Sequence, residues 1–179
     1  MTERGSTAVT QATVPSVAAR GGADERVVEL PTERDTVEFG RRLGGLLRAG
    51  DLVLLAGPLG AGKTVLVRGV AEGLGVTGRV SSPTFVLARV HHPAQGGRGV
   101  PLVHVDAYRL GGHLDELDDL DLDTDLVDAA VVVEWGEGVA DRLSEDHLLI
   151  RLERRPDEVR IAHLEPHGAW TTRDWPAPR

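Results

Sequence analysis

The fold is decided by one stretch of the sequence, Leu52-Val53-Leu54-Leu55-Ala56-Gly57-Pro58-Leu59-Gly60-Ala61-Gly62-Lys63-Thr64. Its first five residues are all aliphatic, as is typical of a central parallel strand that is buried on both faces. A glycine-rich turn follows, and the residues from Lys63 to about Leu74 are predicted to form a helix. The stretch therefore predicts a strand, a loop and a helix in direct succession.

Residues 57–64 also match the phosphate-binding pattern G-x-x-x-x-G-K-[ST], in the strand–loop–helix context that the pattern requires. Glycines let backbone N–H groups converge on phosphate oxygens, and the helix points its positive N-terminal end at the same anion. Lys63 can reach the β- and γ-phosphates, and the hydroxyl of Thr64 can fill one position around a magnesium ion. We therefore predict a nucleoside triphosphate site; the alternative is a glycine-rich turn that binds no ligand.

Two carboxylates follow aliphatic strand candidates. Asp106 ends the run Leu102-Val103-His104-Val105, and Glu134 ends the run Val131-Val132-Val133. Hydrolysis of a nucleoside triphosphate needs a carboxylate near the magnesium, ideally at the C-terminal end of a neighbouring strand. We predict Asp106 as the metal ligand and Glu134 as the residue that orients water; the alternative is that these acids only cap turns.

Ser81-Ser82-Pro83-Thr84 lies between the predicted phosphate-loop helix and the next strand. GTPases and related proteins place a loop that senses the γ-phosphate at this point. The segment is therefore a candidate switch, and the alternative is an ordinary turn opened by Ser-Pro.

The rest of the chain supplies further strands and helices. Arg26–Leu30 is predicted as a strand, and Thr32 with Asp35 predicts the start of a helix that stops near Gly50. Leucines three residues apart in the segment 113–128 follow the spacing of a helix face. The further strand candidates are 85–90, 102–105 and 129–133, and 148–153 with 159–164 predict a terminal hairpin.

This alternation of strands and helices, followed by an antiparallel pair, predicts an α/β fold. We expect one P-loop NTPase domain with a mixed, mainly parallel central sheet, helices on both faces and a C-terminal antiparallel hairpin. The domain is placed at residues 26–165, between a disordered N-terminal tail of residues 1–25 and a C-terminal tail of residues 166–179.

Composition sets further limits. The 179 residues contain no cysteine, which excludes disulfides, thiol catalysis and cysteine-ligated metal centres. The longest apolar runs are strand-sized, far short of the ~18 residues of a membrane-spanning helix, and a secretory signal is not expected either. We expect a cytoplasmic protein with no membrane association.

Charge is distributed unevenly along the chain. Residues 113–128 hold eight acids and no lysine or arginine, and the remainder balances 20 acids against 20 lysines and arginines. A general basic excess, the usual footprint of nucleic-acid binding, is therefore missing, and direct RNA binding is disfavoured. Of these 20 lysines and arginines 19 are arginines, so the lone Lys63 marks a position where a compact ammonium is required.

The lysine count also bears on the nucleotide. GTPases recognise guanine with an N-K-x-D motif, which this chain cannot contain because its only lysine is in the phosphate loop. ATP is therefore the expected nucleotide. The residues alone leave three classes open: a small-molecule kinase, a non-hydrolysing nucleotide-binding adaptor, and a regulatory ATPase whose hydrolysis resets a complex.

Four motifs, in their order and spacing, resemble the bacterial TsaE family. They are Gly60-Ala61-Gly62-Lys63-Thr64, Ser82-Pro83-Thr84-Phe85, His104-Val105-Asp106-Ala107-Tyr108-Arg109-Leu110 and Glu134-Trp135. The resemblance runs from about Val27 to about Leu164. It implies a subunit that binds and hydrolyses Mg-ATP in support of TsaB and TsaD, the proteins that transfer a threonylcarbamoyl group to the tRNA adenosine beside the anticodon.

The resemblance also implies roles for individual residues. It assigns catalysis to Lys63, Asp106 and Glu134, and Mg²⁺ binding to Thr64, Asp106 and Glu134. It further implies weak ATPase activity in the isolated subunit, contact with tRNA only through the complex, and a γ-phosphate switch at Ser82, Pro83, Thr84 and Phe85. The residues that it places against the nucleotide are Thr32, Gly57, Leu59, Gly60, Ala61, Gly62, Lys63, Thr64 and Trp135.

Overall fold

The computed structural model describes residues 26–83, 88–108, 127–136 and 143–173. The elements in this part of the chain are β1 (Arg26–Leu30), α1 (Glu33–Leu46), β2 (Leu52–Ala56), α2 (Lys63–Leu74), β3 (Ala88–His91), β4 (Leu102–Asp106), β5 (Ala130–Glu134), β6 (His147–Arg154), β7 (Arg160–Pro166) and the 3₁₀ helix η2 (Gly168–Thr172). The bounds predicted for β1, β2 and α2 are confirmed. Of the predicted strand 85–90, residues 85–87 lie outside the described residues.

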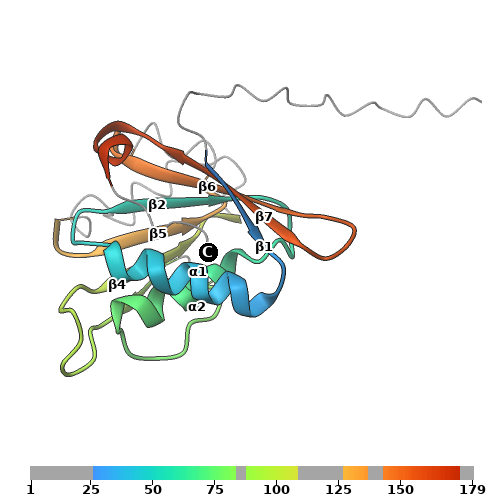
Figure 1. Ribbon diagram of the computed structural model, residues 1–179. Helices are drawn as coiled ribbons and strands as arrows, with labels where there is room; N and C mark the ends of the chain where they lie inside the picture. The colour runs from blue at the N-terminus through green and yellow to red at the C-terminus, as the bar shows by residue number, and fades with distance from the viewer. Residues whose placement is uncertain (1–25, 84–87, 109–126, 137–142, 174–179) are drawn as a thin grey trace, which may run out of the picture.

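A seven-stranded sheet forms the centre of the fold, in the order β1-β7-β6-β2-β5-β4-β3 (Figure 1). The four strands β6, β2, β5 and β4 are parallel to their neighbours within this group. The outer pairs, β1 with β7, β7 with β6 and β3 with β4, are antiparallel. The predicted mixed α/β sheet with a parallel centre and a C-terminal hairpin is confirmed.

The two faces of β2 belong to two hydrophobic clusters. Val53 and Leu55 pack in the cluster that includes Leu43 of α1 and Leu66 of α2, whereas Leu54 belongs to the cluster on the opposite face. Every side chain of β2 is buried, as its continuous aliphatic sequence predicts.

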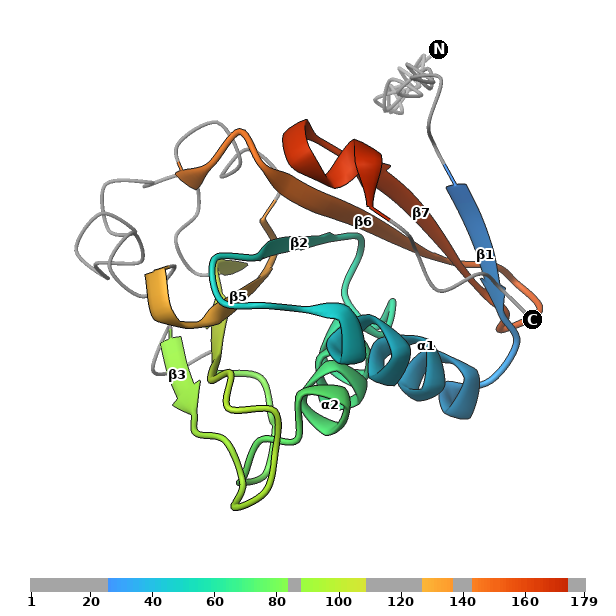
Figure 2. The ribbon, with the colours of Figure 1, turned by 60° about the vertical axis from the view of Figure 1, so that its left-hand side comes forward.

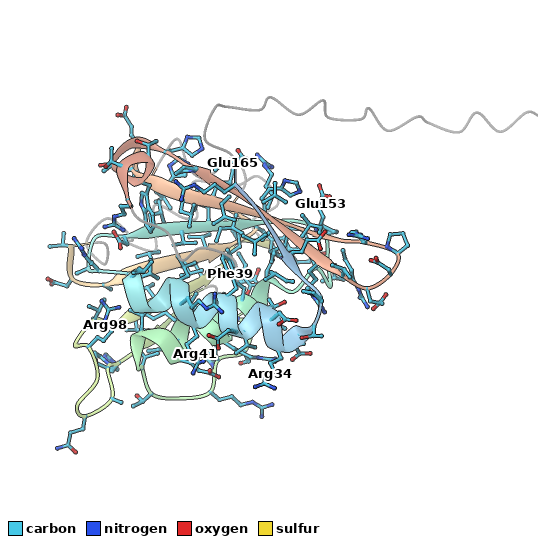
Figure 3. The ribbon with its side chains drawn as sticks, viewed as in Figure 1. Arg34, Phe39, Arg41, Arg98, Glu153 and Glu165 are labelled. Atoms are coloured by element: carbon cyan, nitrogen blue, oxygen red, sulfur yellow. The ribbon has the colours of Figure 1, made fainter. Side chains whose placement is uncertain are left out.

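Both α-helices, α1 and α2, lie side by side on one face of the sheet (Figure 2), so the predicted helices on both faces are not found within the described residues. Phe39 of α1 is buried, whereas Arg34 and Arg41 of the same helix are exposed and point away from the sheet (Figure 3). The acidic segment predicted to form a further helix lies outside the described residues up to position 126.

The two helices approach one another closely because glycines line their contact. A Cβ atom added to Gly44 of α1 would lie 2.2 Å from the carbonyl oxygen of Val70. One added to Gly73 of α2 would lie 2.1 Å from the carbonyl oxygen of Arg41. The backbone of α2, which begins at the phosphate loop, is thereby held directly against the backbone of α1.

The C-terminal part of the domain extends further than predicted. Residues beyond 165 continue into η2, where Trp170 is only 3% exposed and joins the cluster of the helices. Arg173 covers the Trp170 ring and donates to the carboxylate of Asp51 at 2.8 Å. The segment up to Arg173 is therefore packed on the domain. No helix in the described ranges is long and apolar enough to cross a membrane.

Candidate functional site

The phosphate loop leaves the C-terminal end of β2 and enters α2 at Lys63. Gly62, the residue before the helix, has φ 107°, and Gly57 has φ 129°. Both values lie in the region that favours glycine. A Cβ atom on Gly57 would also lie 2.2 Å from the carbonyl oxygen of Leu152, so this turn cannot be built with another residue type without displacing β6.

A cavity of about 430 Å³ opens beside this loop. The structure brings most of the predicted site residues into its wall, from the loop itself, from the ends of β4 and β5 and from the candidate switch. The lining residues are Leu59, Gly60, Gly62, Lys63, Thr64, Val65, Ser82, Asp106, Tyr108, Glu134, Trp135 and Arg160.

Lys63 is 5% exposed and is held by its own loop. Its Nζ atom donates to the carbonyl oxygens of Gly57 at 2.7 Å and Pro58 at 3.0 Å. Burial lowers the pKa of this ammonium group, and the negative charges of Glu134 and Asp106 oppose the shift. A phosphate group that enters the cavity would meet a desolvated ammonium group. Its oxygens would replace the two neutral carbonyl acceptors of Lys63.

Trp135 covers the same ammonium group. The Lys63 Nζ atom lies 3.6 Å from the centroid of the indole ring, within cation–π range. Trp135 has φ 61°, a left-handed conformation that is uncommon for a bulky residue, and its ring also lies 4.9 Å from that of Tyr108. The aromatic ring of Trp135, one of the predicted nucleotide contacts, therefore lines the cavity.

Glu134, at the end of β5, is 3% exposed and has two hydrogen-bonding neighbours, Thr64 and His104. The single Thr64 hydroxyl proton is shared between the two carboxylate oxygens, with Oγ1 2.8 Å from Oε1 and 3.0 Å from Oε2. The Nε2 atom of His104, a fully buried residue of β4, lies 2.8 Å from Oε1. The predicted metal-shell carboxylate thus contacts the predicted metal-binding hydroxyl.

Asp106 lies opposite Glu134 in the register of β4 and β5 and is also 3% exposed. Its Oδ2 accepts from the Ser82 hydroxyl at 2.5 Å, and its Oδ1 accepts from the backbone N–H of Tyr108 at 3.0 Å. Ser82 of the candidate switch therefore contacts a predicted metal ligand directly. The next residue, Pro83, is buried. Thr84 and Phe85 lie outside the described residues.

These oxygen donors fit a magnesium ion that is shared with a nucleotide. The described ranges hold no group of three or more His, Asp, Glu or Cys residues that could bind a metal by themselves. Magnesium in nucleotide sites takes one or two carboxylates and completes its shell with phosphate oxygens and water. The hydroxyl of Thr64 with the carboxylates of Asp106 and Glu134 is such a set.

Two predicted nucleotide contacts have other neighbours in this structure. Thr32 caps α1: its hydroxyl accepts from the N–H of Asp35 at 3.2 Å, and its own N–H donates to the Asp35 carboxylate at 2.9 Å. The Thr32 side chain is absent from the cavity wall given above, so its nucleotide contact stays a prediction. Ala61 is 1% exposed and contributes to the core, which leaves its backbone as the group available to a ligand.

Sequence reasoning missed Arg160, the first residue of β7. Its side chain lines the cavity and packs on the phosphate loop, where a Cβ atom on Gly62 would lie 2.9 Å from the Arg160 Nε atom. This Nε atom is buried without a hydrogen-bond partner among the described residues. No local motif marks Arg160, because only the pairing of β6 with β2 brings the hairpin to the loop.

Comparison with known proteins identifies the family of this chain. The family model described as "Threonylcarbamoyl adenosine biosynthesis protein TsaE" matches residues 30–162, which include all four motifs. The chain belongs to the TsaE family. Family membership ties it to the biosynthesis of threonylcarbamoyladenosine in tRNA.

Relatives in the TsaE family resemble the chain over most of their length. A "tRNA threonylcarbamoyladenosine biosynthesis protein TsaE" from Streptomyces coelicolor is 60% identical over 142 residues, covering 76% of this chain and 95% of that protein. The TsaE protein of Bacillus subtilis is 35% identical over 127 residues, 70% of this chain and 76% of the relative. The crystal structure of Bacillus subtilis YdiB superimposes with a TM-score of 0.64 at 28% identity, over 80% of this chain and 86% of that one.

Proposed function

We propose that this TsaE-family protein binds ATP with Mg²⁺ and hydrolyses it, and that it does so in support of TsaB and TsaD during threonylcarbamoyl modification of tRNA. The observation that carries the proposal is the convergence of Lys63, Thr64, Asp106 and Glu134 on one cavity beside a glycine-rich loop. The family membership supplies the pathway.

The backbone N–H groups of residues 59–64 and the Lys63 ammonium bind the phosphates. Magnesium, when bound by Thr64, Asp106 and Glu134, neutralises charge on the β- and γ-phosphates. Phosphoryl transfer is catalysed mainly by positioning and charge stabilisation. The two buried carboxylates at the strand ends are rigid enough for that task, since each is held by donors from neighbouring elements.

Arg160 adds positive charge to the phosphate side of the cavity. Its guanidinium packs on Gly62, next to Lys63, and its buried Nε–H has no acceptor in the described part of the chain. An anionic oxygen would satisfy this donor. We assign Arg160 to phosphate binding in the same proposal.

Ser82 is the residue through which the candidate switch acts. Its hydroxyl bonds the Asp106 carboxylate, so any change in how Asp106 binds a metal also changes the hydrogen bond to Ser82. This contact links the contents of the cavity to the segment that follows α2. Such a link is what a switch loop requires.

The rim of the cavity offers a surface to the partner proteins. Leu59 at the tip of the phosphate loop is 83% exposed, and Tyr108 is 54% exposed. Exposed apolar side chains on the rim gain free energy when a partner covers them. We assign this rim to docking of TsaB and TsaD, which leaves tRNA to be contacted through those partners.

The test is phosphate release from ATP by the purified protein, alone and with the matching TsaB and TsaD. We expect slow release from the isolated protein and a strong increase with both partners, lost in the Lys63→Ala variant. Turnover that does not depend on the partners would contradict the regulatory role and favour a kinase. Absence of turnover under every condition, with ATP still bound, would favour a nucleotide-binding adaptor.

A further inference from the structure

His104 lies directly behind the proposed metal site. It precedes Asp106 by two residues in β4, and β4 pairs in parallel with β5, which ends in Glu134. The imidazole is fully buried, and its Nε2 atom is 2.8 Å from the Glu134 Oε1 atom. The His104 side chain thus lies in the protein interior and contacts a carboxylate of the neighbouring strand.

The proposed metal site sets the direction of this contact. A carboxylate that binds Mg²⁺ is ionised and only accepts hydrogen bonds, so His104 Nε2 is the donor to Glu134 Oε1 in that site. The Nδ1 atom of His104 is buried with no hydrogen-bond partner in the described ranges. The bond to Glu134 is therefore the hydrogen bond that this buried imidazole makes within the described residues.

The two donors to Glu134 have different relations to a metal ion. The Thr64 hydroxyl is itself a proposed metal ligand, so its lone pairs and its proton must be rearranged when the ion binds. His104 has no part in metal coordination and keeps its bond to Oε1. A hydrogen bond between a donor and a carboxylate in a buried environment is strong and directional.

We propose that His104 is a positioning residue that holds the Glu134 carboxylate in the orientation needed for Mg²⁺ binding with the nucleotide. The inference rests on the proposed function, which places the ion at Thr64, Asp106 and Glu134. Partners of metal-binding side chains commonly change metal affinity by 10- to 100-fold when they are replaced.

The experiment compares His104→Gln, His104→Asn and His104→Leu. A glutamine amide can place an N–H near the position of Nε2, whereas an asparagine amide reaches only as far as Nδ1 and leucine has no donor. The measurement is binding of a fluorescent ATP analogue over a range of Mg²⁺ concentrations and in EDTA. We expect the Asn and Leu variants to need about 10- to 100-fold more Mg²⁺ for half-maximal effect, the Gln variant to stay near wild type, and the affinity in EDTA to stay unchanged in all three.

His91→Leu is the matched control. His91 is a 4% exposed histidine of the adjacent strand β3, and its Nδ1 atom lies 3.4 Å from the carbonyl oxygen of Thr77, away from Glu134. Its replacement removes a buried imidazole of equal size. We expect lower stability and an unchanged Mg²⁺ requirement.

The outcomes separate this inference from the proposed function. If wild type, Gln and Asn variants share one Mg²⁺ requirement, His104 does not position Glu134, and the comparison remains decisive even where the Leu variant does not fold. If wild type binds the analogue with no Mg²⁺ dependence, the metal site of the proposed function is wrong and this inference is overturned with it.

Discussion

Three features of Lys63 together favour a compact ammonium group over a guanidinium group. Lys63 is buried, it donates to two carbonyl oxygens of its own loop, and it lies 3.6 Å from an indole centroid. A guanidinium group is planar and longer, and it cannot occupy the same space as a compact ammonium. The only lysine of an arginine-rich chain stands at this point.

We therefore expect both Lys63→Ala and Lys63→Arg to weaken ATP binding by at least ~10-fold, the scale of a lost charge-assisted hydrogen bond. Isothermal titration calorimetry measures the loss, with thermal melting as a check on folding. Arg68→Ala is the control, because Arg68 is a half-exposed cation on the same helix, 3.7 Å from Glu33 and outside the cavity wall. Wild-type affinity in the Lys63→Arg variant would show that charge alone is needed.

His91 predicts how stability depends on pH. Burial lowers the pKa of this imidazole, and the hydrogen bond to the Thr77 carbonyl only partly opposes the shift. The unfolded chain, with a histidine pKa of about 6.5, therefore binds the proton more tightly than the folded protein. The neutral His91 side chain therefore favours the folded protein fully above the unfolded-state pKa. This stabilisation is lost as the pH falls through the lower pKa of His91 in the folded protein.

The expected result is that stability falls on acidification below about pH 6.5, and falls less in His91→Gln. Urea denaturation at a series of pH values between 5 and 8 gives the free energy of unfolding for both proteins. Parallel curves for wild type and variant would show that other groups set the acid sensitivity.

At the scale of elements, the contact between α1 and α2 depends on glycine. Gly44 and Gly73 each face the carbonyl oxygen of a residue in the other helix, at distances too short for a side chain. Gly45, the next residue of α1, is exposed, and an added Cβ atom there would meet nothing within 4 Å. Replacing glycine by alanine at each of these adjacent positions therefore separates the effect of helix packing on stability from the effect of helix propensity.

We expect Gly44→Ala to destabilise the protein by about 1–3 kcal/mol, the usual cost of overpacking. Gly45→Ala should be neutral or stabilise by up to ~1 kcal/mol, the difference in helix propensity. Chemical denaturation measures both. Equal effects at the two positions would mean that the helices move apart at little cost.

The elements that could be predicted from sequence are those with strong local signals. The aliphatic run 52–56 is β2, and Thr32 with Asp35 forms the predicted helix cap. The motif residues Lys63, Asp106 and Glu134 meet at one edge because carboxyl ends of parallel strands share that edge. Arg160 and the imidazole of His104 could not be placed this way, because their contacts depend on which strands pair.

At the scale of the whole molecule, one end of the sheet carries the candidate site and the opposite end is closed by packing. The phosphate loop and the ends of β4 and β5 surround the cavity. The opposite end, where β2 and β6 begin, is closed by η2 and by the ion pair of Arg173 with Asp51. Local sequence patterns predict a domain boundary at 165, because the burial of Trp170 arises only when β7 returns the chain to this end.

This separation predicts that stability and nucleotide binding can be changed independently. Trp170→Ala removes a ring that is 3% exposed and packed in the main cluster, so we expect a loss of about 3–5 kcal/mol of stability. ATP affinity, measured below the melting temperature of the variant, should stay near wild type, the reverse of the Lys63→Ala result. Thr171→Ala, an exposed change in the same turn, is the control. A parallel loss of affinity in Trp170→Ala would mean that the two ends of the sheet are energetically coupled through β2 and β6.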